Sequence, residues 1–377
     1  MSTAPFTGHA DLREALARAS ADHQLPATLL IHGGPGCGKQ SLALWIAQLR
    51  LCEAPGPTGG CGSCRSCRFA IRLEHPDIHW YFPLARPKGV SGPERLARAL
   101  EQSRQERLIE LRKSPLRPPP PSEVRGLYLA QVLDIRRAAQ KRPAMGAEQV
   151  FILGDAEYLV PQEASPEAAN ALLKLLEEPP PHGRFILTSS RPESLLETIR
   201  SRSLEIHLPP LPQAEVQAFL MEHASATAED ATMAAARSGG SVGQALGHLD
   251  PDGELATRRS EALNLLSHAT QGTRADVYAA AMSFPPARAR ALLDLLADVQ
   301  EGIRDLSRVA LEAPSGPTDT DLPRLSGGAA MTPDQAAAAV DRVEWARTLA
   351  EANVNPQLLM ASLLLDLHDN FRGVRPE

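Results

Sequence analysis

Short apolar segments alternate with helical patterns through the first half of the chain. The segment 27–32 is apolar and leads into a loop rich in glycine and proline, which predicts a buried strand. Four further segments show this pattern, the first two strongly and the last two weakly: 149–153, 184–188, 78–81 and 204–208. Helical patterns separate them, at 39–51, 129–140 and 166–177. Strands that alternate with helices in this way predict a parallel sheet with helices on both faces.

The pattern changes near residue 209, after which we predict no further strand. Short helical patterns cover 213–224 and 228–237, and the glycines of the segment 239–243 then interrupt the helical pattern. From about Glu254 the chain is rich in leucine and alanine and is predicted to be helical. Two late helices are expected to begin where a capping residue precedes a proline, at Thr332-Pro333 and Asn355-Pro356.

The change of pattern divides the chain into three predicted domains. They are an α/β domain over residues 1–208, a small helical domain over 209–250 and a helical C-terminal domain over 254–377. One segment of the first domain, about 84–123, resembles an insertion because it joins a charged helical pattern at 93–113 to four prolines at 118–121. We interpret it as a solvated helix on a flexible stalk, and the alternative is a specific docking element.

Composition excludes several classes of protein. With 43% hydrophobic and 22% charged residues, the 377-residue chain has the balance of a globular protein rather than a disordered one. A net charge of −6 excludes a uniformly basic protein that coats nucleic acid. No run of 18 apolar residues exists, so we expect no membrane partner. The first ten residues lack a basic then apolar signal pattern, and we expect a cytoplasmic protein.

Four of the five cysteines form a compact cluster. Cys52, Cys61, Cys64 and Cys67 follow the spacing C-x8-C-x2-C-x2-C. In a reducing cytosol such a cluster predicts a metal site rather than a disulfide framework, although a reactive or disulfide cluster remains the alternative. The fifth, Cys37, lies inside a glycine-rich loop and is not counted as a ligand.

That loop has the pattern of a phosphate-binding loop. Its residues are Gly33, Gly34, Pro35, Gly36, Cys37, Gly38 and Lys39, followed by Gln40. A predicted strand precedes the loop and a predicted helix follows it, which is the context that such a loop requires. The residue after the lysine is ordinarily Ser or Thr, whose hydroxyl binds Mg²⁺. Because Gln40 stands there, we expect weakened metal binding.

The second half of an ATPase site is altered too. In P-loop ATPases of the AAA+ type, an Asp-Glu pair follows the strand predicted here at 149–153, where the Asp supports Mg²⁺ and the Glu activates water. This chain has Gly154 and Asp155 at those positions, and Glu157 is out of place. Metal binding and water activation are therefore both expected to be weakened.

Three motifs resemble the clamp-loader AAA+ proteins, which include the bacterial DNA polymerase III gamma/tau and delta-prime subunits and the eukaryotic replication factor C subunits. They are Asn-Ala-Leu-Leu-Lys-Leu-Leu-Glu-Glu-Pro-Pro-Pro at 170–181, Phe-Ile-Leu-Thr-Ser-Ser-Arg-Pro at 185–192 and Thr-Ile-Arg-Ser-Arg-Ser at 198–203. The resemblance covers about residues 5–250, and the segment 353–359 is similar to the family's last helix. It implies an AAA+ domain, a small helical lid domain and a helical C-terminal collar domain through which subunits assemble.

The resemblance also implies roles for individual residues. Bacterial members carry a zinc module with this cysteine spacing, here at about 52–67, so Zn²⁺ is the expected metal. Arg202 matches the arginine finger, which reaches the ATP of a neighbouring subunit, and Ser203 replaces the family's Cys. Gly243 stands where the family has an arginine that senses the chain's own nucleotide.

The replaced positions all belong to the chain's own ATP site, whereas Arg202, which serves a neighbour, is kept. This asymmetry is most similar to the delta-prime subunits. It implies a component of the DNA polymerase III holoenzyme that binds ATP or ADP weakly or not at all and hydrolyses neither. The resemblance also implies that this component assembles with gamma/tau and delta subunits, and that the complex loads a sliding clamp onto primed DNA. Two alternatives stay open: an ATP-hydrolysing gamma/tau-like motor subunit, and a zinc-dependent module that binds nucleic acid.

Overall fold

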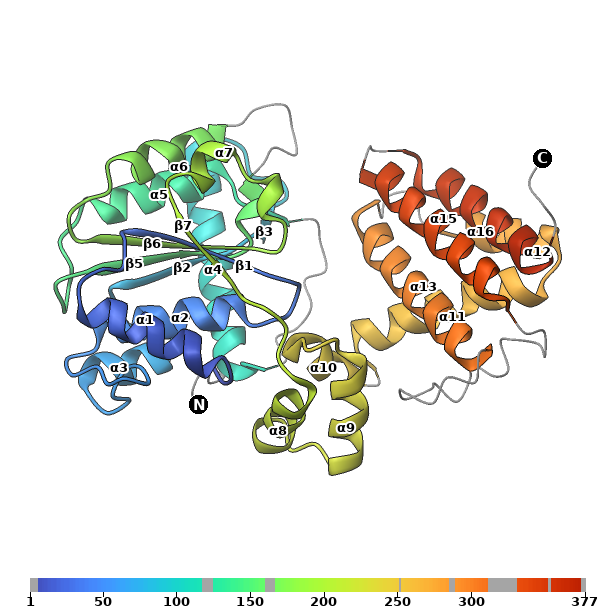
Figure 1. The fold of residues 1–377 in the computed structure, drawn as a ribbon. Helices are drawn as coiled ribbons and strands as arrows, with labels where there is room; N and C mark the ends of the chain where they lie inside the picture. Colours follow the sequence, from blue (N-terminus) through green and yellow to red (C-terminus); the bar gives the residue numbers. More distant parts are fainter. Residues whose placement is uncertain are drawn as a thin grey trace. The chain divides into compact units, whose positions relative to one another are not determined.

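The computed structural model describes residues 6–116, 125–159, 167–250, 252–284, 289–310, 331–351 and 354–373. The segments 118–121, 160–166 and 311–330 and the residue Asn353 lie outside these ranges, together with the sequence predictions made on them. The chain divides into two compact units, Met1–Leu249 and Asp250–Glu377, each with its own core (Figure 1).

A five-stranded parallel sheet forms the centre of the first unit. In spatial order its strands are β2 (Ile78–Tyr81), β5 (Gln149–Leu153), β6 (Gly183–Ser189), β1 (Thr28–His32) and β7 (Leu204–His207). All five were predicted from the sequence. A separate antiparallel pair joins β3 (Leu84–Ala85) to β4 (Arg125–Gly126). Because the strands are parallel, the loops that follow β1, β5 and β6 meet at one edge of the sheet.

Helices cover both faces of this sheet, as Figure 1 shows. Leu29 and Ile31 of β1 point to one face and Leu30 to the other, because successive side chains of a strand alternate. The first face is covered by α1 (Ala10–Ala21) and α2 (Lys39–Leu51), and the second by α5 (Leu129–Ala139) and α6 (Glu167–Glu177). The first unit also contains four shorter helical elements: α3 (Arg65–Ile71), η1 (Ala156–Leu159), η2 (Pro192–Ser194) and α7 (Glu197–Arg200).

The helix of the inserted segment, α4 (Pro93–Lys113), has the predicted bounds but is not solvated on all sides. Leu100 and Leu108 are buried in the same hydrophobic cluster as the face covered by α2. Arg104 is also buried, donates from Nη1 to the Trp80 carbonyl at 3.2 Å, and lies 4.9 Å from the centre of the Tyr81 ring. The solvated interpretation is therefore wrong for one face of α4, which is part of the core.

Three short helices follow the sheet: α8 (Gln213–His223), α9 (Ala228–Arg237) and α10 (Val242–His248). They share a small core that includes Val216, Leu220 and Ala234. The interruption predicted over 239–243 is shorter than expected. The left-handed backbone of Gly239 and Gly240 makes the turn, and α10 then begins at once because the Ser241 hydroxyl caps it, accepting from the Gln244 N–H.

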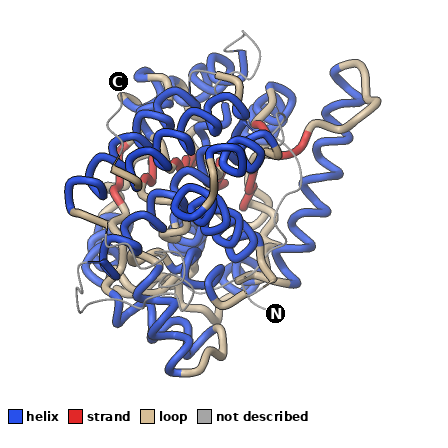
Figure 2. The backbone as a smooth tube through the Cα atoms, turned by 90° about the vertical axis from the view of Figure 1, so that its right-hand side faces the viewer, coloured by secondary structure: helices blue, strands red, loops and turns tan. Residues whose placement is uncertain are grey.

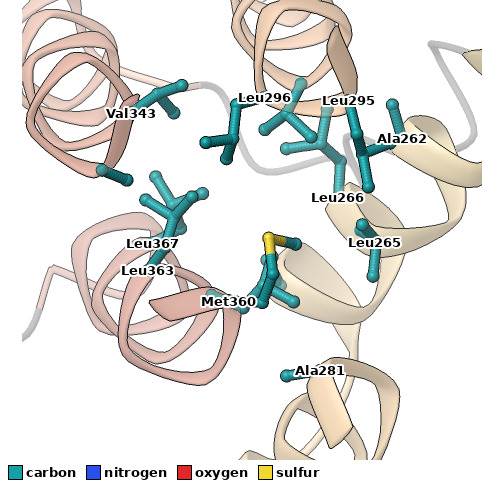
Figure 3. Packing of buried hydrophobic residues seen from close by; sticks show 14 of the residues in the cluster. Ala262, Leu265, Leu266, Ala281, Leu295, Leu296, Val343, Met360, Leu363 and Leu367 are labelled. Carbon is teal, nitrogen blue, oxygen red and sulfur yellow. The ribbon is translucent and has the colours of Figure 1, made fainter. Parts of the chain in front are cut away.

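The second unit contains only helices among its described residues: α11 (Glu254–Gln271), α12 (Arg274–Met282), α13 (Ala289–Ala310), α15 (Pro333–Glu351) and α16 (Pro356–Phe371) (Figure 2, helices in blue). Leu266, Leu296, Val343 and Leu367 meet in its core, as Figure 3 shows. Both late helix starts are confirmed, because Thr332 and Asn355 accept hydrogen bonds from the first turns of α15 and α16. No described helix combines the length and the apolar character that a membrane span needs.

Candidate functional site

The phosphate loop connects the end of β1 to the start of α2, as predicted. Gly36 and Gly38 have φ angles of 72° and 98°, a left-handed backbone that favours glycine. Lys39 is only 5% exposed, and its ammonium donates to the carbonyls of Gly33 at 2.9 Å and Gly34 at 2.8 Å. The lysine that binds phosphates in ATPases is therefore bonded here to its own loop.

Gln40 fills the place between the loop and the end of β5. Its side-chain amide Nε2 donates to Oδ2 of Asp155 at 3.0 Å, although 115 residues separate the two. A Cβ atom built on Gly154 would lie 3.0–3.2 Å from the three terminal atoms of the Gln40 side chain. An aspartate at 154, which would support Mg²⁺, would therefore require the end of the Gln40 side chain to shift. The changes at 40, 154 and 155 fit one another as a single packed, hydrogen-bonded group.

The two acids that follow β5 are both engaged within the chain. Asp155 has a left-handed backbone (φ 50°), and its N–H donates to the Thr188 hydroxyl at 3.0 Å. Glu157 lies in η1 and is buried, and its carboxylate accepts the Ser190 N–H at 3.0 Å. Glu157 therefore holds the end of β6.

The start of α10 contacts the phosphate loop through the backbone. The Gly243 N–H donates to the Gly36 carbonyl at 2.9 Å, and the Ser241 hydroxyl donates to the Pro35 carbonyl at 3.0 Å. A Cβ on Gly243 would lie 2.8 Å from the Gly36 Cα, and a Cβ on Gly36 would lie 2.6 Å from the Ser241 oxygen. Both glycines are required by this approach. We name the four residues Pro35, Gly36, Ser241 and Gly243 the lid contact.

The four clustered cysteines lie at the end of α2, in the loop that follows it and in the first turn of α3. Their sulfur atoms all fall within 4.8 Å of one another. Tetrahedral Zn²⁺ with Zn–S bonds of about 2.3 Å places its sulfurs roughly 3.8 Å apart, so a small contraction closes the site. Cys52 ends α2 and Cys64 caps α3, which explains why this spacing brings the thiols together. The donor set therefore fits a structural metal ion.

Backbone N–H groups favour thiolates in this cluster. The N–H groups of Cys61, Cys64 and Cys67 donate to the sulfurs of Cys52, Cys61 and Cys64 at 3.1, 3.3 and 3.3 Å. The Ser63 hydroxyl bonds the Cys61 sulfur and, with nearby N–H groups, lowers the pKa of that thiol to about 6. Burial raises the pKa of Cys67 to about 12. A bound cation would offset that rise, because metal ligation favours the thiolate.

Nearby candidate ligands are committed to other contacts. The His75 ring bonds the Ser66 hydroxyl at 2.7 Å and accepts the Asp77 N–H at 3.0 Å. His79 stacks on Phe151 with ring centres 4.8 Å apart. Cys37 is buried in the phosphate loop, where desolvation raises its pKa, and it does not belong to the cluster.

Arg202 lies exposed in the turn between α7 and β7. Its Nη2 is 2.8 Å from Oε1 of Glu177, the last residue of α6, and its Nη1 donates to the Thr198 carbonyl at 3.0 Å. The Ser203 hydroxyl donates to the Ile199 carbonyl at 2.8 Å, which fixes the turn. Sequence reasoning missed Glu177, and the one available signal was an acidic residue at the carboxyl end of a helix, where a negative charge is unfavourable.

Arg202 and the phosphate loop lie at opposite edges of the sheet. Leu204, two residues after Arg202, pairs with Leu29 at the amino end of β1, whereas the loop begins at Gly33. Those four residues of parallel strand span about 13 Å. Arg202 therefore cannot reach phosphates bound at its own loop.

The sheet order, the phosphate loop after β1 and the helical lid that follows define a P-loop α/β protein of the AAA+ type, with a cluster of four cysteines. A family profile described as "DNA polymerase III, delta subunit" matches residues 8–212. The delta-prime subunit of DNA polymerase III from Escherichia coli is 28% identical over 344 residues, which are 89% of this chain and 87% of that one. The chain therefore belongs to the DNA polymerase III delta-prime subunit family of clamp-loader AAA+ proteins.

Other relatives match over shorter stretches. The delta-prime subunit of Pseudomonas aeruginosa is 32% identical over 186 residues, which cover 49% of this chain and 43% of that protein. Among solved structures, a gamma subunit-related protein of DNA polymerase III from Thermotoga maritima covers 95% of this chain and 99% of its own, at 15% identity and a TM-score of 0.44. The family assignment rests on the sequence matches alone.

Proposed function

We propose that the chain is the clamp-loader subunit that hydrolyses no ATP itself and supplies Arg202 to the ATP site of a neighbouring subunit. The observation that carries this proposal is the group formed by Gln40, Gly154 and Asp155. These residues replace the ones that would hold the metal in the chain's own site, and they contact one another, while Arg202 stays exposed at the opposite edge of the sheet. The chain's own ATP site has lost its metal-binding residues. Arg202, which would serve another chain, is exposed at the surface.

Loss of hydrolysis follows from the chemistry that phosphoryl transfer needs. Mg²⁺ bridges the phosphates and neutralises the charge that develops on them, and a positioned residue orients the attacking water. Gln40 and Gly154 supply neither a hydroxyl nor a carboxylate for the metal. Asp155, at the water-activating position, already accepts the Gln40 amide. Nucleotide binding through the loop would also have to displace Lys39 from the loop carbonyls.

An arginine suits the role in trans. The guanidinium is always charged, planar and able to donate several hydrogen bonds to phosphoryl oxygens. Arg202 is exposed, and within the described ranges its polar contacts are Glu177 and the Thr198 carbonyl, so it can meet a neighbour's phosphates. Its separation from the chain's own loop excludes the same role in cis.

The domains and partners of the proposal follow from the family. Residues 1–208 form the AAA+ domain with its zinc module at about 52–67, 209–250 the lid and 254–377 the collar. The collar would assemble the chain with gamma/tau and delta subunits, and the complex would load the sliding clamp onto primed DNA. Cys52, Cys61, Cys64 and Cys67 would hold Zn²⁺, which would stabilise the connection between α2 and α3.

We expect no ATP turnover above background from the isolated chain. Its steady-state phosphate release should equal that of Lys39→Ala, because metal binding and water activation are both absent. Gln40→Thr alone should not restore turnover, since Gly154 and Asp155 stay unchanged. A rate well above that of Lys39→Ala would contradict the proposal and favour a motor subunit.

Elemental analysis of freshly purified protein should find one zinc per chain. Cys64→Ser should lower that content, because four thiolates close a structural site. Cys37→Ser is the matched control and should retain the metal. Chelation should expose the segment 52–67 to protease while the far-ultraviolet circular dichroism of the protein persists. The reason is that the ligands lie in a local segment outside the strands of the sheet. Well under one zinc per wild-type chain would refute the site.

A further inference from the structure

Glu177 has no evident role in stabilising the helix that carries it. It is the last residue of α6, where the partial negative charge of the helix end disfavours a carboxylate. The next residue, Glu178, is exposed and forms no hydrogen bond or ion pair with the described part of the chain. Glu177 instead contacts Arg202, 2.8 Å away, across the junction of α6 with the turn after α7. The cost of placing an acid there is therefore offset by one specific partner.

The two arginines of the segment 198–203 are held by different acids. Arg200 bonds Glu205 of β7 at 2.9 Å, which ties it to its own sheet. Arg202 forms an ion pair with Glu177 and donates a hydrogen bond to the Thr198 carbonyl, and neither contact draws it into the core. The guanidinium has five N–H donors, and one of them donates to the Thr198 carbonyl, so others can donate to oxygens of a phosphate.

We propose that Glu177 is a positioning residue for Arg202. It holds the guanidinium in one orientation before a neighbour's nucleotide arrives, so that less side-chain freedom is lost when the phosphates are bound. The inference rests on the proposed function of Arg202 and adds the residue that prepares it. Glu177 itself touches neither nucleotide nor metal in this account.

The expected effect is moderate, because the pair is partly exposed. The side chains of Arg202 and Glu177 are 37% and 45% accessible, so water screens their attraction. Pairs of this kind correspond to about a two- to five-fold change in an equilibrium or a rate. Loss of this positioning should lower the maximal rate of clamp loading and leave the ATP concentration at half-maximal rate nearly unchanged. The reason is that the arginine acts on charge that develops in the transition state.

The test uses the clamp loader reconstituted from its purified subunits with this full-length chain. Glu177→Ala should lower the maximal rate of clamp loading about two- to five-fold, with little change in the ATP concentration at half-maximal rate. Glu178→Ala, the adjacent control, should have no effect. Glu177→Gln should recover part of the loss, because an amide oxygen of the same reach can still accept an N–H of the guanidinium. In an Arg202→Ala background, Glu177→Ala should cause no further loss.

The outcomes separate the two claims. If Arg202→Ala itself changes nothing, the proposed function is wrong and this inference falls with it. If Arg202→Ala lowers loading but Glu177→Ala matches Glu178→Ala, only the inference is overturned. A faster loader with Glu177→Ala would mean that the acid detains the arginine, and an added loss in the Arg202→Ala background would mean that it acts elsewhere. Either result overturns the inference.

Discussion

Arg202→Ala is expected to lower hydrolysis at one ATP site of the assembled clamp loader by about 10³–10⁵-fold, the range seen when a comparable arginine is absent from phosphoryl transfer. The site affected is the neighbour's, because the chain's own loop lies at the far edge of the sheet. In a complex with several ATP sites the bulk ATPase rate should fall only in part. Clamp loading should fall more steeply, because it needs the sites to act together. Both rates are measured with the reconstituted complex on primed DNA.

Three controls make this result specific. Arg202→Lys should not rescue loading, because an ammonium lacks the planar fork of a guanidinium. Arg200→Ala removes the neighbouring arginine, which contacts Glu205 of β7 in the same chain, and should have a much smaller effect. Gel filtration should show that Arg202→Ala assembles normally, since one exposed side chain contributes little interface area. Unchanged loading by an assembled complex would make Arg202 an ordinary surface arginine.

Gly243→Ala is expected to destabilise the protein by about 1–3 kcal/mol, the usual cost of forcing one extra methyl group into packed space. The added Cβ would lie 2.8 Å from the Gly36 Cα, and both are backbone positions that cannot rotate away. Within a helix, alanine is ordinarily favoured over glycine by about 1 kcal/mol, so a loss of stability here would be steric. Denaturant unfolding of the full chain measures the change.

Gly239→Asn is the matched control for this prediction. Gly239 also lies beside α10, but a Cβ there meets nothing within 4 Å, and asparagine tolerates its left-handed backbone (φ 57°). The control should therefore be close to neutral. A stabilising Gly243→Ala would show that the lid contact is not formed. If the contact is formed, an arginine at 243 cannot serve as a nucleotide sensor without moving the lid.

The sheet could be predicted from the sequence because its strands are short apolar segments bounded by turn residues. Phe151 and Ile152 are buried on opposite faces of β5, as a strand covered by helices on both sides requires. Helix starts with strong caps were predicted for the same local reason, and Asn355 is the clearest example. These signals lie within a few residues of one another.

Other features depend on contacts that no local pattern records. The bond from Gln40 to Asp155 joins residues 115 positions apart, so the sequence showed two separate losses rather than one packed group. The buried face of α4 was not predicted from the sequence, because charged residues on the other sides of the helix dominate its pattern. The approach of Gly243 to Gly36 likewise depends on how the lid folds back on the loop.

One comparison tests the central claim most directly: clamp loading by reconstituted complexes that carry Lys39→Ala or Arg202→Ala in this chain, each with assembly confirmed. If the chain acts on a neighbour's ATP and not on its own, Lys39→Ala should load clamps at close to the wild-type rate and Arg202→Ala should load far more slowly. The reverse order, with loading lost in Lys39→Ala and kept in Arg202→Ala, would show that the chain works through its own nucleotide and would contradict the account.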